Sequence, residues 1–183
     1  LIKAETLSFF AGRHAEGGNA CSFLSFDLED PAGYGRVIRE GGRVRVVEHK
    51  DATEEERAVK EVNSGMYIFD TAALADVIDE ISCANAQGEY YLPDALSLIG
   101  SRGGRVEAVK ADYAEEFLGI NDQTQLAAAA RIMRDRIVGD FMINAGLQCM
   151  DPSSLWIGPK VKIGRDVVIH PSVQLWGETV IED

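Results

Sequence analysis

Apolar residues recur with a period of six near the end of the chain. One series consists of Leu155, Val161, Val167 and Val173, and a second series, two residues later, consists of Ile157, Ile163, Ile169, Leu175 and Ile181. This spacing is typical of hexapeptide repeats in a parallel β-helix, in which three short faces of about six residues close one coil. Residues 155–183 therefore predict roughly one and a half coils, fewer than the ~3 repeats that usually bury a solenoid core. We expect the solenoid to continue beyond residue 183.

The residues before the repeat have the pattern of a mixed α/β domain. Strands are predicted over residues 23–28, 65–69 and 106–109, and the Gly41-Gly42 pair predicts a two-residue turn that joins strands 36–40 and 43–48 into a hairpin. Helices are predicted over residues 54–60, 94–99 and 124–138, and over residues 71–81 with Thr71 as the N-cap. We place the boundary between the two parts after residue 139, so that the predicted domains are residues 1–139 and 140–183.

Composition excludes several classes of protein. A net charge of −12 argues against non-specific binding to nucleic acids or anionic membranes. No apolar run approaches the ~20 residues of a membrane span, and the first residues lack the pattern of a signal peptide. The three cysteines and three histidines are scattered without metal-ligand spacing, which favours free thiols in a reducing cytoplasm. The first residue is Leu1 rather than Met, so we expect a segment upstream as well.

Four polar segments could each be ordinary structural chemistry. Gly33-Tyr34-Gly35 can be a turn, and Glu48-His49-Lys50-Asp51 can be a solvated strand end. Asn63-Ser64-Gly65 can be a turn before a strand, and Asn121-Asp122 can cap the helix that follows. None of these segments indicates a function by itself.

Their order along the chain resembles a known family. Six segments occur together in this order: Asp30-Pro31-Ala32-Gly33-Tyr34-Gly35-Arg36, Glu48-His49-Lys50-Asp51-Ala52, Asn63-Ser64-Gly65, the stretch from Asn85 to Leu92, Gly119-Ile120-Asn121-Asp122 and the hexapeptides. The chain is similar throughout to the bacterial bifunctional N-acetylglucosamine-1-phosphate uridylyltransferase/glucosamine-1-phosphate acetyltransferases. The resemblance implies the later part of a Rossmann-like nucleotidyltransferase domain, followed by the start of a left-handed parallel β-helix that carries the acetyltransferase and forms a homotrimer.

The resemblance also implies roles for single residues. Gly35 matches a glycine whose backbone N–H binds the sugar, where the lack of a side chain permits close approach. Glu48 matches a glutamate that accepts hydrogen bonds from sugar hydroxyls, and Asn63 matches an asparagine that contacts the sugar. Asn121 matches an asparagine that contacts the substrate and helps to hold Mg2+. Tyr91 falls near the sugar pocket, and Pro93 replaces a threonine that is common in the family.

The implied activity is a phosphoryl transfer without a covalent intermediate on the protein. The substrates would be UTP and N-acetylglucosamine 1-phosphate, and the second reaction would use acetyl-CoA and glucosamine 1-phosphate, in a cytoplasmic enzyme of cell-wall precursor synthesis. No residue here resembles a nucleophile or a general base, and the family's phosphate-binding loop and metal-binding aspartate have no counterpart in these residues. We therefore expect these 183 residues alone to be inactive. Two alternatives stay open: another sugar-phosphate nucleotidylyltransferase with a β-helix tail, such as a relative of the glucose-1-phosphate adenylyltransferases, and a non-catalytic hexapeptide scaffold.

Overall fold

The computed structural model describes every residue from Leu1 to Asp183. The chain forms two compact units, one of residues 2–118 and one of residues 119–183 together with Leu1.

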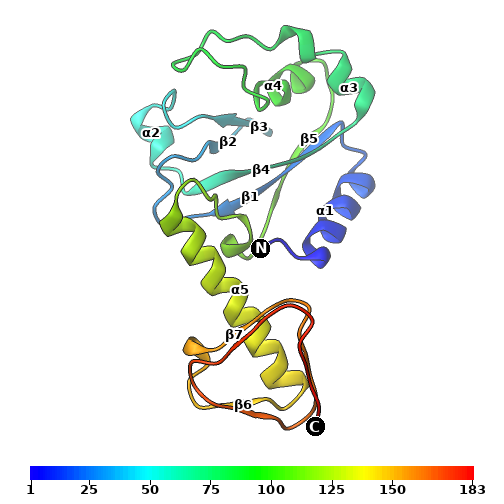
Figure 1. Ribbon diagram of the computed structural model, residues 1–183. Coiled ribbons are helices and arrows are strands. Elements are labelled where there is room, and N and C mark those ends of the chain that lie inside the picture. Colours follow the sequence, from blue (N-terminus) through cyan, green and yellow to red (C-terminus); the bar gives the residue numbers. More distant parts are fainter. The chain divides into compact units, whose positions relative to one another are not determined.

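The first unit is built on a five-stranded sheet with the order β3-β2-β4-β1-β5 (Figure 1). Its strands are β1 (Cys21–Asp27), β2 (Arg36–Glu40), β3 (Arg43–Val47), β4 (Glu61–Phe69) and β5 (Val106–Lys110). Strand β1 pairs antiparallel with β4 and parallel with β5. Side chains alternate across β1, so Phe23 enters one apolar core while Leu24 and Phe26 enter the other. Apolar residues therefore cover both faces of this strand.

Short helices cover the two faces of the sheet. They are α1 (Ala4–Gly17), α2 (Glu54–Arg57), α3 (Thr71–Ala75) and α4 (Asp94–Ser101), with single 3-10 turns η1 (Ile78–Glu80) and η2 (Ala114–Phe117). Helix α1 packs against β1 and β5, and α4 packs against β3 and β5. The prediction of a mixed α/β domain is therefore confirmed.

Several predicted elements differ from the structure. The helix expected over residues 71–81 is broken into α3 and η1, and its N-cap is Asp70, whose carboxylate accepts from the N–H of Ala73 at 2.9 Å. The β-branched pair Val77-Ile78 lies at the break, and such residues favour helices poorly. Helix α2 ends at Arg57, earlier than predicted, whereas α4 continues through Gly100 to Ser101.

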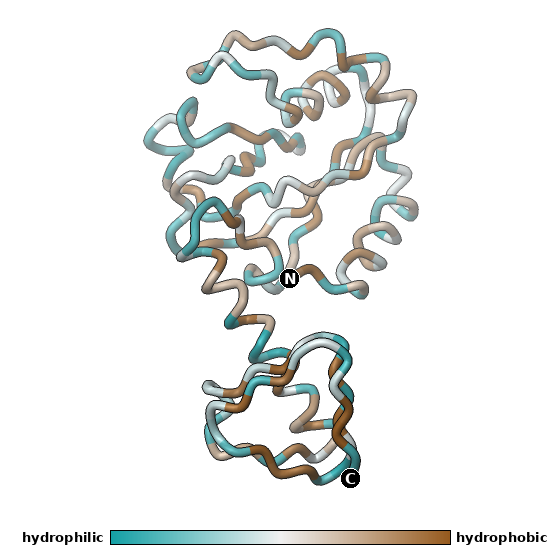
Figure 2. Tube along the Cα trace, in the orientation of Figure 1, coloured by the Kyte–Doolittle hydropathy of each residue, from teal (hydrophilic) through white to brown (hydrophobic).

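The second unit combines a long helix with short parallel strands. Helix α5 (Gln123–Asn144) is followed by β6 (Gln148–Cys149), η3 (Pro152–Ser154), β7 (Trp156–Ile157), β8 (Lys162–Ile163), β9 (Val168–Ile169), β10 (Gln174–Leu175) and β11 (Val180–Ile181). Strand β7 pairs with β10 and β8 with β11, so that Trp156 and Lys162 lie opposite residues eighteen positions later, Gln174 and Val180. Figure 2 shows these residues tracing two superimposed turns.

The six-residue pattern of apolar positions fills the core of this unit. Leu155, Ile157, Val161 and Ile169 are buried together with Val138 of α5. Because α5 packs against β7, the compact units divide before this helix rather than after it. The domain boundary that we place after residue 139 stays a prediction. None of the helices combines the length and the apolar character that crossing a bilayer requires.

Two glycine substitutions should change stability in opposite directions. Gly42 has a φ of 78° in the hairpin turn and Gly139 lies within α5, and a Cβ on either would meet no atom within 4 Å. We expect Gly42→Ala to destabilise the first unit by about 1 kcal/mol, because of its left-handed backbone. Gly139→Ala should stabilise the second unit by about 1 kcal/mol. Urea unfolding tests both variants, with circular dichroism for the whole chain and the fluorescence of Trp156 and Trp176 for the second unit. Changes of the same sign in the free energy of unfolding of the two variants would contradict the expectation.

Candidate functional site

Three of the predicted site residues lie at the two ends of the β2–β3 hairpin and on β4. Gly35 directly precedes β2, Glu48 directly follows β3, and the N–H of Asn63 on β4 donates to the carbonyl of Gly35 at 2.9 Å. A Cβ placed on Gly35 would lie 3.1 Å from Oε1 of Glu48 and 2.9 Å from a methyl carbon of Val46. A residue larger than glycine would therefore press against the Val46 side chain and the Glu48 carboxylate.

The Asn63 side chain is held in one orientation by two hydrogen bonds. Its Nδ2 donates to the Tyr67 hydroxyl at 2.6 Å, and its Oδ1 accepts from the N–H of Gly65 at 3.1 Å. Burial raises the pKa of Tyr67 well above its usual value, against the lowering effect of the Asn63 hydrogen bond. Tyr67 therefore stays a neutral phenol, and it packs between the rings of Phe23 and Phe69. Sequence analysis did not single out Tyr67, although its place four residues after Asn63 on the same strand was a usable signal.

An acidic cavity of about 320 Å³ opens beside Glu48. Its lining includes Asp51, Tyr91, Pro93 and Asp94, whereas Gly35 and Asn63 lie outside it. Burial, and then the charges of Asp51 and Asp94, raise the pKa of Glu48; burial and Asp51 raise that of Asp94. A raised carboxyl pKa means that the fold disfavours the ionised form, so ionised Glu48 costs stability above its folded-state pKa. Ionised carboxylates can only accept hydrogen bonds, which makes this cavity suited to hydroxyl donors.

The fourth predicted residue, Asn121, belongs to the second unit. It is exposed, and its backbone N–H donates to Oε1 of Gln125 at 2.5 Å. The N-cap of α5 is Asp122, whose carboxylate accepts from the N–H of Gln125 at 2.8 Å and from the Thr124 hydroxyl at 2.6 Å. No group of three His, Cys, Asp or Glu side chains in the chain is arranged to hold a metal ion. Asn121 therefore offers one amide oxygen, and a bound cation would need phosphates or further carboxylates as ligands.

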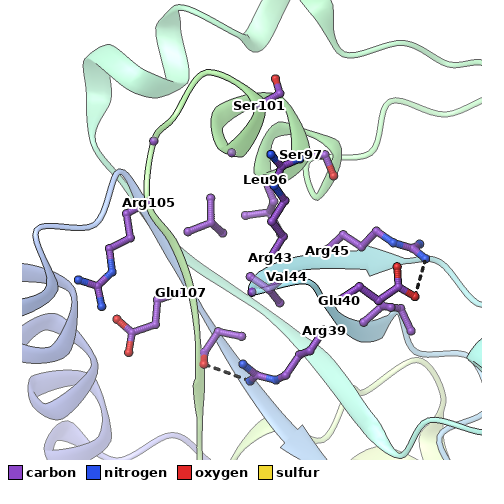
Figure 3. A pocket seen from close by; sticks show the side chains of 16 residues that line it. Arg39, Glu40, Arg43, Val44, Arg45, Leu96, Ser97, Ser101, Arg105 and Glu107 are labelled. Atoms are coloured by element: carbon purple, nitrogen blue, oxygen red, sulfur yellow. Dashed lines mark hydrogen bonds and ion pairs between the residues drawn. The ribbon is translucent and has the colours of Figure 1, made fainter.

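A second cavity, of about 730 Å³, contains none of the residues predicted for the site (Figure 3). It lies between the β2–β3 hairpin, α4 and β5, and several arginines line it. Arg39 binds Glu61 and the carbonyl of Ala108, Arg45 binds Glu56, and Arg105 donates to the carbonyl of Gly17. Arg39 and Arg45 are therefore paired with carboxylates, whereas Arg43 and Arg105, which have no carboxylate partner, leave positive charge at this cavity.

Curated proteins similar to this chain are bifunctional GlmU proteins. The chain is 48% identical over 185 residues to the bifunctional protein GlmU of Corynebacterium aurimucosum, 43% identical to that of a Geobacillus species and 44% identical to that of Thermobifida fusca. These alignments cover 99–100% of this chain. The chain is similar to GlmU proteins over the segment that it matches. It spans 38–40% of the length of these GlmU proteins.

Structural comparison supports the fold of the GlmU-like chain. A solved structure from Bacillus anthracis, described as a glucose-1-phosphate thymidylyltransferase in complex with sucrose, matches with a TM-score of 0.52. The match covers 71% of this chain and 50% of the other, at 16% identity, and so it bears on the fold alone. No profile of a protein family matches the chain.

Proposed function

We propose that this chain supplies the sugar-binding half of an N-acetylglucosamine-1-phosphate uridylyltransferase. The observation that carries the proposal is the convergence of Gly35, Glu48 and Asn63 next to the acidic cavity, in a chain that matches GlmU proteins along its whole length. In the reaction, a phosphate oxygen of N-acetylglucosamine 1-phosphate attacks the α-phosphate of UTP, and pyrophosphate leaves. Such a transfer depends mainly on positioning and on neutralising charge.

The proposed roles follow from the chemistry of each side chain. The backbone at Gly35 accepts the close approach of the sugar because it has no Cβ. Glu48 accepts hydrogen bonds from hydroxyl groups of the sugar, and the amide of Asn63, which Tyr67 orients, binds another polar group of the sugar. Asn121 would be one of the ligands of Mg2+, an ion that neutralises phosphate charge when bound. The attacking phosphate is already ionised, so these residues need not remove a proton from it.

We further propose that residues 140–183 begin a left-handed parallel β-helix. The parallel pairing of residues eighteen positions apart supports a coil of three six-residue faces. In the GlmU-like enzyme this β-helix would continue, form a homotrimer and acetylate glucosamine 1-phosphate from acetyl-CoA. The enzyme would act in the cytoplasm, where UTP and acetyl-CoA are available.

A hybrid enzyme tests the proposed function. These 183 residues replace the matching segment of the Corynebacterium aurimucosum GlmU, and pyrophosphate release is measured with UTP and N-acetylglucosamine 1-phosphate. We expect turnover in the hybrid enzyme and a loss of about 100-fold in kcat/KM for Glu48→Ala and for Asn63→Ala, because each removes a contact that positions the sugar. Arg43→Ala, which changes an exposed residue of the hairpin, serves as the control.

Other outcomes identify the alternatives. A preference of the hybrid enzyme for ATP or for glucose 1-phosphate would contradict the proposal and favour a different sugar-phosphate nucleotidylyltransferase. Equal affinity of the unmodified enzyme and both alanine variants for UDP-N-acetylglucosamine, measured by calorimetry, would favour a scaffold role for this chain.

A further inference from the structure

A loop of eleven residues, 82–92, forms one wall of the acidic cavity. It joins η1 to α4 without a helix or a strand of its own, and it contributes Ala84, Asn85 and Tyr91 to the lining. Most of its residues are exposed, and the ring of Tyr90 is 74% exposed. Apolar packing therefore contributes little to holding this wall in place.

Two residues of the turn after β3 attach the loop to the sheet. Oδ1 of Asp51 accepts from the N–H of Ala86 at 2.8 Å, and Nζ of Lys50 donates to Oε1 of Gln87 at 2.6 Å. The same Gln87 donates through Nε2 to the Tyr91 hydroxyl at 2.7 Å. Lys50 is thus connected through the Gln87 side chain to the hydroxyl of Tyr91.

The remaining hydrogen bonds of the loop are internal or reach the start of α4. Oδ1 of Asn85 accepts from the N–H groups of Gln87 and Glu89 at 3.1 Å and 3.2 Å, which keeps the loop tip compact. The N–H of Asp94 donates to the carbonyl of Tyr91 at 3.0 Å. The loop can therefore move as one piece if the bonds to Lys50 and Asp51 open.

The turn that holds the loop also carries Glu48. The N–H of Asp51 donates to the carbonyl of Glu48 at 3.0 Å, so these two residues are fixed relative to each other. This turn therefore fixes Glu48 on one side of the cavity. The bonds from Lys50 and Asp51 to the 82–92 loop fix Tyr91 on the other side.

We propose that Asp51 and Lys50 are positioning residues, which hold the 82–92 loop and Tyr91 at the distance from Glu48 that fits one sugar ring. The inference rests on the proposed function of the cavity. Asp51 also lines the cavity, but its proposed role is exerted through the loop and not through contact with the sugar. Opening of the two bonds widens the cavity, and their closure narrows it around the sugar.

The attachment itself is tested on the 183-residue chain by amide hydrogen exchange, without any substrate. We expect Asp51→Ala to accelerate exchange at Ala86 at least tenfold, because this N–H loses its acceptor. Asp51→Asn should exchange nearly as slowly as the unmodified chain, since an amide oxygen can replace the carboxylate oxygen. Asp79→Ala, at an exposed aspartate on η1, is the matched control. Unchanged exchange in Asp51→Ala would overturn the attachment.

The positioning role is tested by steady-state kinetics in the hybrid enzyme. We expect Asp51→Ala to raise the KM for N-acetylglucosamine 1-phosphate about five- to tenfold, the effect of losing one or two hydrogen bonds. The KM for UTP and the Tm should stay unchanged, and Asp51→Asn should restore most of the affinity for the sugar phosphate. Equal increases in both KM values, or no increase beyond that of Asp79→Ala, would overturn the role. Absence of turnover in the unmodified hybrid would contradict the proposed function instead, and the exchange measurement would still decide the attachment.

Discussion

Gly35→Ala should abolish most of the uridylyltransferase activity of the hybrid enzyme while leaving the fold intact. The added methyl group would lie 2.9 Å from a Val46 methyl carbon and 3.1 Å from Oε1 of Glu48, closer than ordinary van der Waals contact. The flexible carboxylate of Glu48 can move away more easily than the strand. The carboxylate needs to shift by only a few tenths of an ångström to restore ordinary contact. Because a displacement of about 1 Å in a positioning group can cost 100-fold in rate, we expect this smaller shift to lower kcat/KM for the sugar phosphate about tenfold.

Two further variants separate this effect from a general loss of stability. Gly12→Ala, in α1, introduces the same methyl group where it would meet no atom within 4 Å, and it should leave activity unchanged. Gly35→Ala combined with Val46→Ala removes one of the two close contacts, and it should recover part of the activity. Steady-state kinetics with each substrate and a thermal unfolding curve for each variant give the answer. Full activity of Gly35→Ala would contradict the proposed dependence of the reaction on the position of the Glu48 carboxylate.

Arg36→Ala should be the most destabilising of the substitutions considered for the first unit. The Arg36 side chain is only 2% exposed, and no carboxylate pairs with it. Its guanidinium donates to the carbonyl of Tyr34 and to the carbonyl of Arg57 at 3.3 Å, and it lies 3.4 Å from Nδ1 of His49. Burial and the nearby charge of Arg57 lower the pKa of Arg36.

Those partners lie on three separate segments around the candidate site. Loss of the side chain would remove its hydrogen bonds to two carbonyls and would open a cavity, so we expect a decrease of about 2–4 kcal/mol in the free energy of unfolding. Urea unfolding measures the change. Arg43→Ala, at an exposed arginine of the same hairpin, should change the free energy by less than about 0.5 kcal/mol. Similar changes in the free energy of unfolding for the two variants would show that Arg36 does not stabilise the packing of these segments.

Sequence patterns predicted the hairpin and the repeat well because both depend on local rules. Gly41 and Gly42 have φ values of 56° and 78°, the backbone that a tight two-residue hairpin turn requires. The buried side chains of Leu155, Ile157, Val161 and Ile169 follow the six-residue apolar series. In both cases the residues that define the pattern are close in sequence, so that the chain alone carries the information.

Helix α1 was not predicted, because its sequence carries only weak signals. Its N-cap, Lys3, makes no capping hydrogen bond through its side chain, and Phe10 is its only buried residue. A usable signal was present at its end, where Gly18 adopts a left-handed conformation with a φ of 57°. The helix start is stabilised by Glu116, whose carboxylate accepts from the Lys3 N–H at 3.0 Å. A contact between residues so distant in sequence cannot be read from a local pattern.

The Asn63-Ser64-Gly65 segment shows how a local signal can be correct and still misplaced. Turn chemistry is present there, since Gly65 has a φ of 79° and the Asn63 and Ser64 side chains bond to the backbone two residues later. The structure places it inside β4, where the register with β1 shifts. An irregular strand can use the residues of a turn, and only the pairing partner distinguishes the two cases. This irregularity lies beside Asn63, whose amide it helps to orient.

The regular spacing of the short strands has a consequence for synthesis on the ribosome. Each of β10 and β11 finds its partner eighteen residues earlier in the chain, and α5, which supplies part of the core, precedes them all. At roughly 5–20 residues per second of translation, a strand emerges about one to four seconds after the strand that it joins. Both strands can thus pair with a partner that has already left the ribosome. The backbone groups of that partner stay unpaired for only a few seconds. The interval in which a nascent strand could pair wrongly with a neighbour is therefore about the same for β10 and for β11.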